Sequence, residues 1–504
     1  MTTISARRWI RVDLLGAAGR VLDADLSRPL PFAILAVVFF ALRAPFVGYG
    51  HGTDPDAWRV ALTAHHLLDT GQYLPSRLPG NPLHELAMTL FIPGGWVATN
   101  LATAAVSLAG VYLFARIVDQ HRLSHAGLLT IGFAFAPLLF INSIATMDYM
   151  WTLTATLAAY YAVLRGMPLW AGVCLGLAMG FRLQSFVLWP ALAFLVWRRE
   201  GARSLAPFTL AAAGVTALTF APVLAAYGLD FWNFYDAAVG YQDVLRLLGK
   251  EALGVLGGLG VLAGAILSLP RLRRLPRDAV HDPHLTAWLA VIALYFASFF
   301  RLPHEVAYLI PVFPFGLLIM GRYFARPALI GAVAAILLAG VVDITTPSDD
   351  LDLASFRSAR IGQGLLFSNA ETMKVQRAFV EDVVNAEVPD HSVVITGFVY
   401  PQLAVRERDR LTAGVLEHDY DAISLLSDRG EAVDGKRDVR YVWLLTYDAF
   451  QALRSQGYSF FVVPDAVEGT AALYDYHPTL FGATYLRLER PAPSAAKGTA
   501  ATDR

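Results

Sequence analysis

Apolar stretches long enough to cross a lipid bilayer recur along the first 345 residues of the chain. Hydrophobic residues make up 56% of the 504 residues, charged residues only 16%, and the mean hydropathy is +0.48. Since a helix needs about 20 mostly apolar residues to span the hydrocarbon core, this pattern predicts a mostly α, polytopic membrane helix bundle. We expect about eleven transmembrane helices, near residues 30–47, 95–115, 127–144, 148–165, 168–181, 183–197, 205–226, 252–269, 285–300, 306–321 and 327–345.

Arginines are concentrated in alternate loops between these stretches, and this asymmetry predicts the orientation. The positive-inside rule places such loops in the cytoplasm. We therefore expect residues 1–29 to form a cytoplasmic interfacial segment and the loop 48–94 to lie outside the plasma membrane. An odd number of spans also puts the C-terminus outside. The basic loops contain Arg116 and Arg122, Arg165, Arg198, Arg199 and Arg203, Arg271, Arg273, Arg274 and Arg277, and Arg322 and Arg326.

The composition changes near Thr346, after which charged residues become frequent. Strand-like runs occur at 391–400, 441–446, 458–463 and 484–488, and helical patterns at 369–386 and 447–456. Alternation of helices and strands predicts a small α/β domain. We expect residues 346–490 to form a soluble extracytoplasmic domain and 491–504, rich in Ala, Pro and Ser, to be a disordered tail.

Two further observations narrow the class of protein. The net charge is −1 and no basic stripe with interleaved aromatic residues is present, so we expect no nucleic-acid partner. The single cysteine, Cys174, lies in an apolar stretch and cannot form an intrachain disulfide. The expected partners are membrane lipids and a substrate that reaches the bundle from the membrane.

The loop 48–94 carries two carboxylates, Asp54 and Asp56, directly after the first expected span. Acidic groups at the rim of a membrane are costly to desolvate and usually have a function. The short outer loops add further ionisable residues, whose side chains must stay near the membrane interface. The candidates on this face are Arg59, Arg77, His84, Glu85, Asp148, Arg182, Gln184, Arg301, His304 and Glu305.

Acids and bases gathered on one face favour a cavity open to the outside. A transporter needs polar groups near the midplane and access from both sides, so this pattern argues against a transporter. A lipid-linked substrate, by contrast, has its headgroup at the depth of these loops. The implied chemistry is glycosyl transfer from a polyprenyl-phosphate sugar. A carboxylate removes a proton from the acceptor hydroxyl, and Arg or His stabilises the leaving phosphate. Direct attack inverts the anomeric centre without a covalent intermediate.

The chain resembles the GT-C superfamily of membrane glycosyltransferases, including protein O-mannosyltransferases and aminoarabinose transferases. The first outer loop contains Asp54-Pro55-Asp56 and continues into Tyr73-Leu74-Pro75-Ser76-Arg77-Leu78-Pro79-Gly80-Asn81-Pro82. Asp148 precedes the fourth expected span, and a late outer loop reads Arg301-Leu302-Pro303-His304-Glu305-Val306-Ala307-Tyr308-Leu309-Ile310-Pro311. The resemblance covers about residues 30–345, and a soluble C-terminal domain fits it by position.

This resemblance implies that Asp54 or Asp56 is the catalytic base, with Asp54 preferred and Asp148 a further acid of the site. The acceptor is a lipid, a glycan or a protein, and a divalent metal, Mg or Mn, is a candidate cofactor. Structural alternatives stay open: Asp54, Asp56 and Asp148 as helix-capping or first-turn acids, Arg77 as a loop-shaping residue, and Arg182 as a snorkelling arginine. His304 and Glu305 could be a structural pair, and His84 with Glu85 a metal pair. A lipid-linked glycan transporter or flippase, or an inactive glycolipid-binding protein, is the alternative function.

Overall fold

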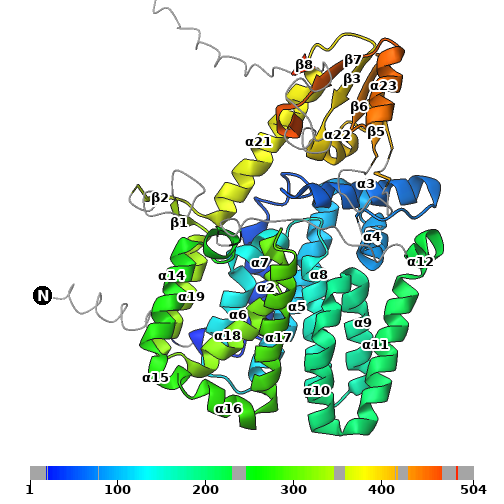
Figure 1. Ribbon diagram of the computed structural model, residues 1–504. Coiled ribbons are helices and arrows are strands. Elements are labelled where there is room, and N and C mark those ends of the chain that lie inside the picture. The colour runs from blue at the N-terminus through cyan, green and yellow to red at the C-terminus, as the bar shows by residue number, and fades with distance from the viewer. Residues whose placement is uncertain are drawn as a thin grey trace, which may run out of the picture. The chain divides into compact units, whose positions relative to one another are not determined.

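The computed structural model describes residues 19, 21–77, 79–229, 244, 246–345, 358–414, 416–417, 429–467 and 484–485. These residues divide into two compact units, with the main boundary between Lys374 and Val375. The first unit is a helix bundle and the second contains a six-stranded sheet (Figure 1). The expected interfacial segment lies almost wholly outside the described residues, and the expected disordered tail lies entirely outside them.

The apolar stretches of the first unit form helices, as the sequence predicts. The bundle helices are α2 (Pro29–Arg43), α5 (Gly95–Gln120), α6 (Ala126–Phe135), α7 (Pro137–Asn142), α8 (Tyr149–Leu164), α9 (Pro168–Phe181), α10 (Trp189–Glu200), α11 (Leu205–Thr219), α12 (Ala221–Tyr227), α14 (Val255–Leu267), α17 (Pro283–Arg301), α18 (Val312–Tyr323) and α19 (Arg326–Ala339). Large apolar side chains such as Phe114, Trp288 and Leu329 fill the core between them.

Helix length alone identifies fewer spans than the sequence pattern. Among the described residues, two helical segments, Ile92–Gln120 and Pro283–Arg301, are long and apolar enough to cross a membrane. The number rises to four if each of two bent helix pairs, with bends of 55° and 70°, counts as one span. Proline explains several breaks, because it lacks the N–H that continues a helix. The stretch near 127–144, for example, is divided between α6 and α7 at Pro137. The count of about eleven therefore stays a prediction.

Helices α9 and α11, which α10 separates in the chain, pack closely along a row of glycines of α9. A Cβ atom on Gly172 would lie 2.2 Å from the Phe208 carbonyl oxygen, and one on Gly176 would lie 2.7 Å from the Ala212 carbonyl oxygen. Only a residue without a side chain permits this approach of two backbones. The close packing places the end of α9, where Arg182 follows, at a defined position beside α8.

The two ends of the bundle differ in their charges. Helices α3 (Pro55–Thr70) and α4 (Pro82–Thr89) lie at the end where α8 begins, whereas α15 (Leu269–Leu272) and α16 (Leu275–His281) lie at the opposite end (Figure 1). The latter region carries Arg271, Arg273, Arg274 and Arg277. Acidic loops and arginine-rich loops thus separate as expected, while their assignment to the two sides of a membrane stays a prediction.

The second unit alternates strands and helices, as expected for an α/β domain. Its sheet has the order β4-β5-β6-β3-β7-β8, in which β3 is parallel to β6 and β7, and β8 is parallel to β7. The strands are β3 (Ser392–Ile395), β4 (Leu411–Ala413), β5 (Glu431–Asp434), β6 (Val439–Val442), β7 (Ser459–Val462) and β8 (Thr484–Tyr485), and the helices are α22 (Tyr400–Arg406) and α23 (Tyr447–Ser455). Helix α21 (Leu365–Asn385) begins in the first unit and ends in the second.

Four short strands differ from the expected pattern. The apolar stretch 327–345 ends as a helix at Ala339, and Val342–Thr345 forms strand β1, paired antiparallel with β2 (Arg360–Gln363). β-Branched residues in Val342-Asp343-Ile344-Thr345 favour this extended conformation. The antiparallel pair β4–β5 was not apparent from the sequence, because both strands are very short.

Candidate active site

Asp54 and Asp56 occupy the start of α3, and their positions follow from local sequence. The Asp54 carboxylate accepts a hydrogen bond from the Asp56 backbone N–H at 2.8 Å, and Pro55 occupies the first helical position. This is the geometry of a helix N-cap, in which an acidic side chain satisfies an otherwise unpaired backbone donor. The capping role expected for Asp54 is therefore confirmed. The cap uses one oxygen of the carboxylate, Oδ1.

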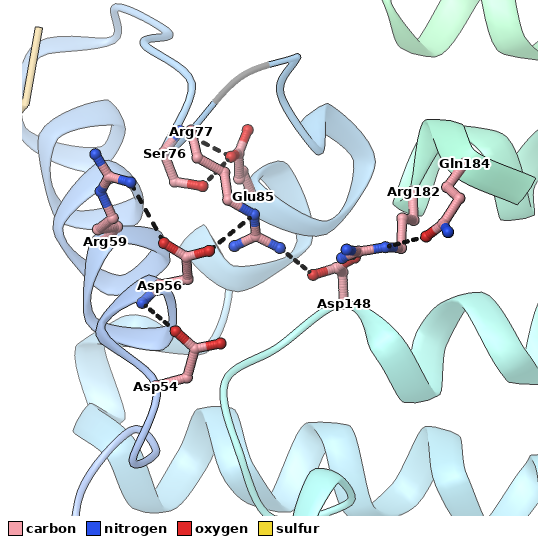
Figure 2. Close-up of polar contacts among 9 residues, drawn as sticks. All are labelled: Asp54, Asp56, Arg59, Ser76, Arg77, Glu85, Asp148, Arg182 and Gln184. Atoms are coloured by element: carbon pink, nitrogen blue, oxygen red, sulfur yellow. Dashed lines mark hydrogen bonds and ion pairs between the residues drawn. The ribbon is translucent and has the colours of Figure 1, made fainter. Parts of the chain in front are cut away.

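Arg77 connects the acid of the first loop to the acid that precedes α8. Its Nε lies 3.3 Å from Asp56 Oδ2, and its Nη2 lies 2.6 Å from Asp148 Oδ1 (Figure 2). Asp56 also pairs with Arg59, whose Nη1 is 3.4 Å from Asp56 Oδ1. Arg77 therefore does more than shape its loop, because it joins two carboxylates 92 residues apart in the chain (148 − 56).

Asp148 is fully buried and its side chain does not cap α8. Its second oxygen, Oδ2, accepts from Arg182 Nη1 at 2.9 Å, so each oxygen has an arginine partner. Burial by itself raises the pKa of Asp148, but Arg182 and Arg77 outweigh it and hold this pKa well below its usual range. The capping alternative for Asp148 is wrong. A carboxylate held ionised in this way also accepts a proton poorly.

Arg182 lies between two aromatic rings. Its guanidinium carbon is 4.6 Å from the ring centres of both Tyr149 and Tyr308, and Tyr308 belongs to the 3₁₀ turn Val306–Leu309. Its Nε donates to Gln184 Oε1 at 3.3 Å, and Gln184 Nε2 donates to Ser298 Oγ at 2.8 Å. These contacts hold Arg182 inside the protein. The snorkelling alternative is therefore wrong.

Glu85 and His84 are neighbours in sequence but face different surroundings. The Glu85 carboxylate accepts from the Ser76 backbone N–H at 2.8 Å and is also hydrogen-bonded to the Ser76 and Tyr73 hydroxyls. These bonds close the loop between α3 and α4. The His84 ring packs edge-on against Trp151, and burial lowers its pKa to about 4, so it is neutral at pH 7.

The described residues do not fit a divalent metal. No group of three or more His, Cys, Asp or Glu side chains that could hold a metal ion occurs within the described part of the chain. Asp56 and Asp148 are paired with arginines, and the Glu85 carboxylate is used by its own loop. The proposed metal pair of His84 and Glu85 thus lacks a common coordination centre.

Two carboxyl groups near the arginines have raised pKa values. Burial, together with the charge of Asp56, raises the pKa of Asp54 to about 7. Burial, together with the charges of Asp54 and Asp56, raises the pKa of Glu305 to about 8. The pKa values of Asp54 and Glu305 are raised, whereas that of Asp148 is lowered. Neighbouring acids whose pKa values are shifted in opposite directions are typical of acid–base sites. The other two candidates of the late loop, Arg301 and His304, are exposed.

The candidate residues named from the sequence did not include four side chains that complete this arrangement. Tyr149 and Tyr308 flank Arg182, and Ser76 and Tyr73 hold Glu85. Aromatic residues are common near membrane interfaces, so their presence carried no specific signal. A polar run within an apolar stretch, Asn142-Ser143-Ile144-Ala145-Thr146, is a sequence signal of this region.

The fold is similar to that of a solved protein, ArnT from Cupriavidus metallidurans. The crystal structure of ArnT from Cupriavidus metallidurans in the apo state matches with a TM-score of 0.50 and 15% identity, over 75% of this chain and 84% of that chain. A structure of ArnT from the same organism, bound to undecaprenyl phosphate, matches with a TM-score of 0.49 and 14% identity over the same shares. At this identity the likeness shows the fold alone.

No protein-family model matches the chain. No curated protein matches it either.

Proposed function

We propose that this protein is an integral membrane glycosyltransferase that moves a sugar from a polyprenyl-phosphate donor to an acceptor hydroxyl on the extracytoplasmic face. The observation that carries the proposal is the contrast between Asp54 and its neighbours. Asp56 and Asp148 are paired with arginines, whereas Asp54 accepts a backbone N–H and has its pKa raised to about 7. A base works best when its pKa lies near the working pH.

Asp54 acts as the general base in the proposed reaction. Its carboxylate takes the proton of the acceptor hydroxyl while that oxygen attacks the anomeric carbon. The bond between the anomeric carbon and the phosphate oxygen breaks, and its electron pair leaves with the lipid phosphate. Attack opposite to the leaving group inverts the anomeric centre in one step. General base catalysis of this kind typically contributes about 10²–10⁴-fold to the rate.

Arg77 and Arg182 are suited to stabilise the phosphate that leaves. Asp148 holds both guanidinium groups through its two oxygens, at 2.6 and 2.9 Å (Figure 2). Arg77 Nη1 is buried and has no hydrogen-bond partner among the described residues. A buried donor without a partner is costly, and a phosphate oxygen would satisfy it. While Asp54 is protonated, Arg59, Arg77 and Arg182 together with Asp56 and Asp148 carry a net charge of +1 (3 − 2), which favours an anionic lipid headgroup.

Asp148 has a supporting role in this proposal. Its pKa lies well below the usual range because Arg182 and Arg77 face it. It fixes the separation of the two cations and does not exchange protons during the reaction.

A transfer assay with the purified full chain in lipid nanodiscs tests the proposal. Polyprenyl-phosphate donors carrying different sugars are incubated with lipid, glycan and protein acceptors, and release of polyprenyl phosphate is measured. Asp54→Asn should lose at least about 100-fold in rate, while donor binding stays within about threefold. Asp119→Asn, an exposed acid at the far end of α5, is the matched control.

Two results would contradict the proposal. Wild-type rates in both single variants Asp54→Asn and Asp56→Asn, and in their double variant, would exclude an aspartate base in this loop. Binding of donor without release of polyprenyl phosphate under any acceptor, combined with movement of labelled lipid across the membrane, would favour the transporter alternative.

A further inference from the structure

The two loops that carry Asp54 and Asp148 are joined by buried hydrogen bonds that the proposed chemistry does not use. The Thr146 backbone N–H donates to the His51 carbonyl at 2.7 Å. His51 Nδ1 also lies 2.8 Å from Thr146 Oγ1, and this hydroxyl donates to Asn100 Oδ1 at 3.0 Å. All three side chains are at most 1% exposed. A direct link therefore exists between residues 48–54 and residues 143–148.

Asn100 extends the link to the backbone of the first loop. Its Nδ2 donates to the carbonyl oxygens of Gly50, at 2.8 Å, and Val47, at 3.2 Å. Thr99, one residue earlier on α5, lies with its Oγ1 2.8 Å from Thr146 Oγ1. Helix α5 thus serves as the common support for both loops. We call His51, Thr99, Asn100 and Thr146 the loop-bridging network.

The position of this network in the chain gives it mechanical importance. His51 precedes Asp54 by three residues, and Thr146 precedes Asp148 by two. Trp58, in the first turns of α3, donates its Nε1–H to the Gly52 carbonyl at 2.9 Å, so the helix capped by Asp54 is tied to the same loop. A change in the bridge would therefore displace Asp54 relative to the Asp148–arginine group.

Polar groups are buried only at a cost, and a network is favourable only when its members satisfy one another. Thr146 meets this condition with bonds to His51, Thr99 and Asn100. Thr156, about two turns into α8, shows the contrast: it is equally buried, but its hydroxyl has no hydrogen-bond partner among the described residues. The described part of the chain therefore contains a buried threonine that belongs to the bridge and one that does not.

We propose that the loop-bridging network is a positioning device that holds Asp54 at a fixed distance from the Asp148–arginine group. Its residues act through the loops and do not touch the substrate. The proposal rests on the proposed function, because it assigns the network a role in the same reaction. Small displacements of reacting groups can cost about 10²-fold in rate, so a rigid link between the base and the phosphate-binding cations has a direct effect on turnover.

Thr146→Val tests this role, because it removes the hydroxyl while keeping the shape of the side chain. We expect kcat to fall about 10- to 100-fold, with the KM for the donor within twofold of wild type. Because burial is the main cause of the raised pKa of Asp54, loosened packing should also move the acid limb of the pH profile to lower pH. The charged and titratable groups that face Asp54 are Asp56, Arg77, Asp148, Tyr149 and Glu305.

Three further variants separate positioning from general destabilisation. Thr146→Ser retains the hydroxyl and should restore both kcat and the acid limb. His51→Asn keeps an amide nitrogen near the position of Nδ1 and serves as a milder second variant if Thr146→Val does not fold. Thr156→Val makes the same chemical change without breaking a bridge and should leave kcat, KM and the pH profile unchanged.

Hydrogen–deuterium exchange gives a readout that does not depend on transfer activity. In Thr146→Val, amides in residues 48–54 and 143–148 should exchange faster together, whereas Thr156→Val should leave both segments protected as in wild type. Wild-type exchange and wild-type kcat in Thr146→Val would overturn the proposal. Equal losses in Thr146→Val and Thr156→Val would overturn it as well. If wild type shows no transfer while the two loops still loosen together, the proposed function fails and the structural link stands.

Discussion

The acid limb of the pH profile is the sharpest prediction of the structure. If Asp54 is the base, activity requires its deprotonated form, and its pKa of about 7 sets the midpoint of the acid limb of kcat/KM. At pH 5, two units below this pKa, only about 1% of Asp54 is deprotonated, so kcat/KM should be about 100-fold below its plateau. An ordinary aspartate would give almost no loss at this pH.

Asp56→Asn perturbs this limb in a defined direction. The charge of Asp56 is the second cause, after burial, of the raised pKa of Asp54, whereas Arg77 lowers it. Removing the Asp56 charge therefore lowers the pKa of Asp54 and moves the acid limb to lower pH. The assay is kcat/KM measured from pH 4.5 to 8.5 at constant ionic strength. An acid limb near pH 4 in wild type, or one that Asp56→Asn leaves in place, would refute the assignment of Asp54.

The remaining predictions concern stability and the cation pair. The folded-state pKa of Asp54 is raised from 3.8 to about 7, so its contribution to stability is full below the ordinary pKa and is lost as the pH rises through about 7. Asp54→Asn, which retains a capping side chain, should therefore raise the unfolding midpoint at pH 8 but not at pH 4; about 4 kcal/mol is the upper limit for a shift of about three units, and partial exposure reduces it. An equal change at both pH values would contradict this. Asp148→Asn leaves Arg182 without its acidic partner and Arg77 with Asp56 alone, and it should cost about 3–5 kcal/mol of unfolding free energy, measured by denaturation in detergent; a loss below about 1 kcal/mol would contradict the buried pairing. Arg182→Lys keeps the charge but loses the planar contact with the two tyrosines, so the KM for the donor should rise several-fold, and an unchanged KM would exclude a phosphate contact. Glu85→Gln leaves the Ser76 donors with a weaker acceptor and should cost about 1–2 kcal/mol, with more rapid proteolysis of the loop between α3 and α4 as the readout.

Much of the fold could be predicted from local patterns in the sequence. Apolar runs predicted the helices α5 and α17, and the Asp54-Pro55-Asp56 segment predicted the start of α3. These features depend on hydropathy and on backbone hydrogen bonds within a few residues. The same reasoning was wrong where a proline interrupts an apolar run, as at Pro137 between α6 and α7.

The sequence by itself determined that a membrane helix bundle gathers acids and a few bases at one end and carries arginine-rich loops at the other. Only the tertiary structure decided which of these groups meet. Asp148 is hydrogen-bonded to Arg77 and Arg182, which lie 71 and 34 residues away in the sequence. This pairing distinguishes Asp148 from Asp54. The pKa of a carboxyl depends on burial and on charges brought near by distant segments, and no local pattern contains that information. The resemblance already favoured Asp54 over Asp56, and the contacts made by the distant loops add a physical reason for that preference.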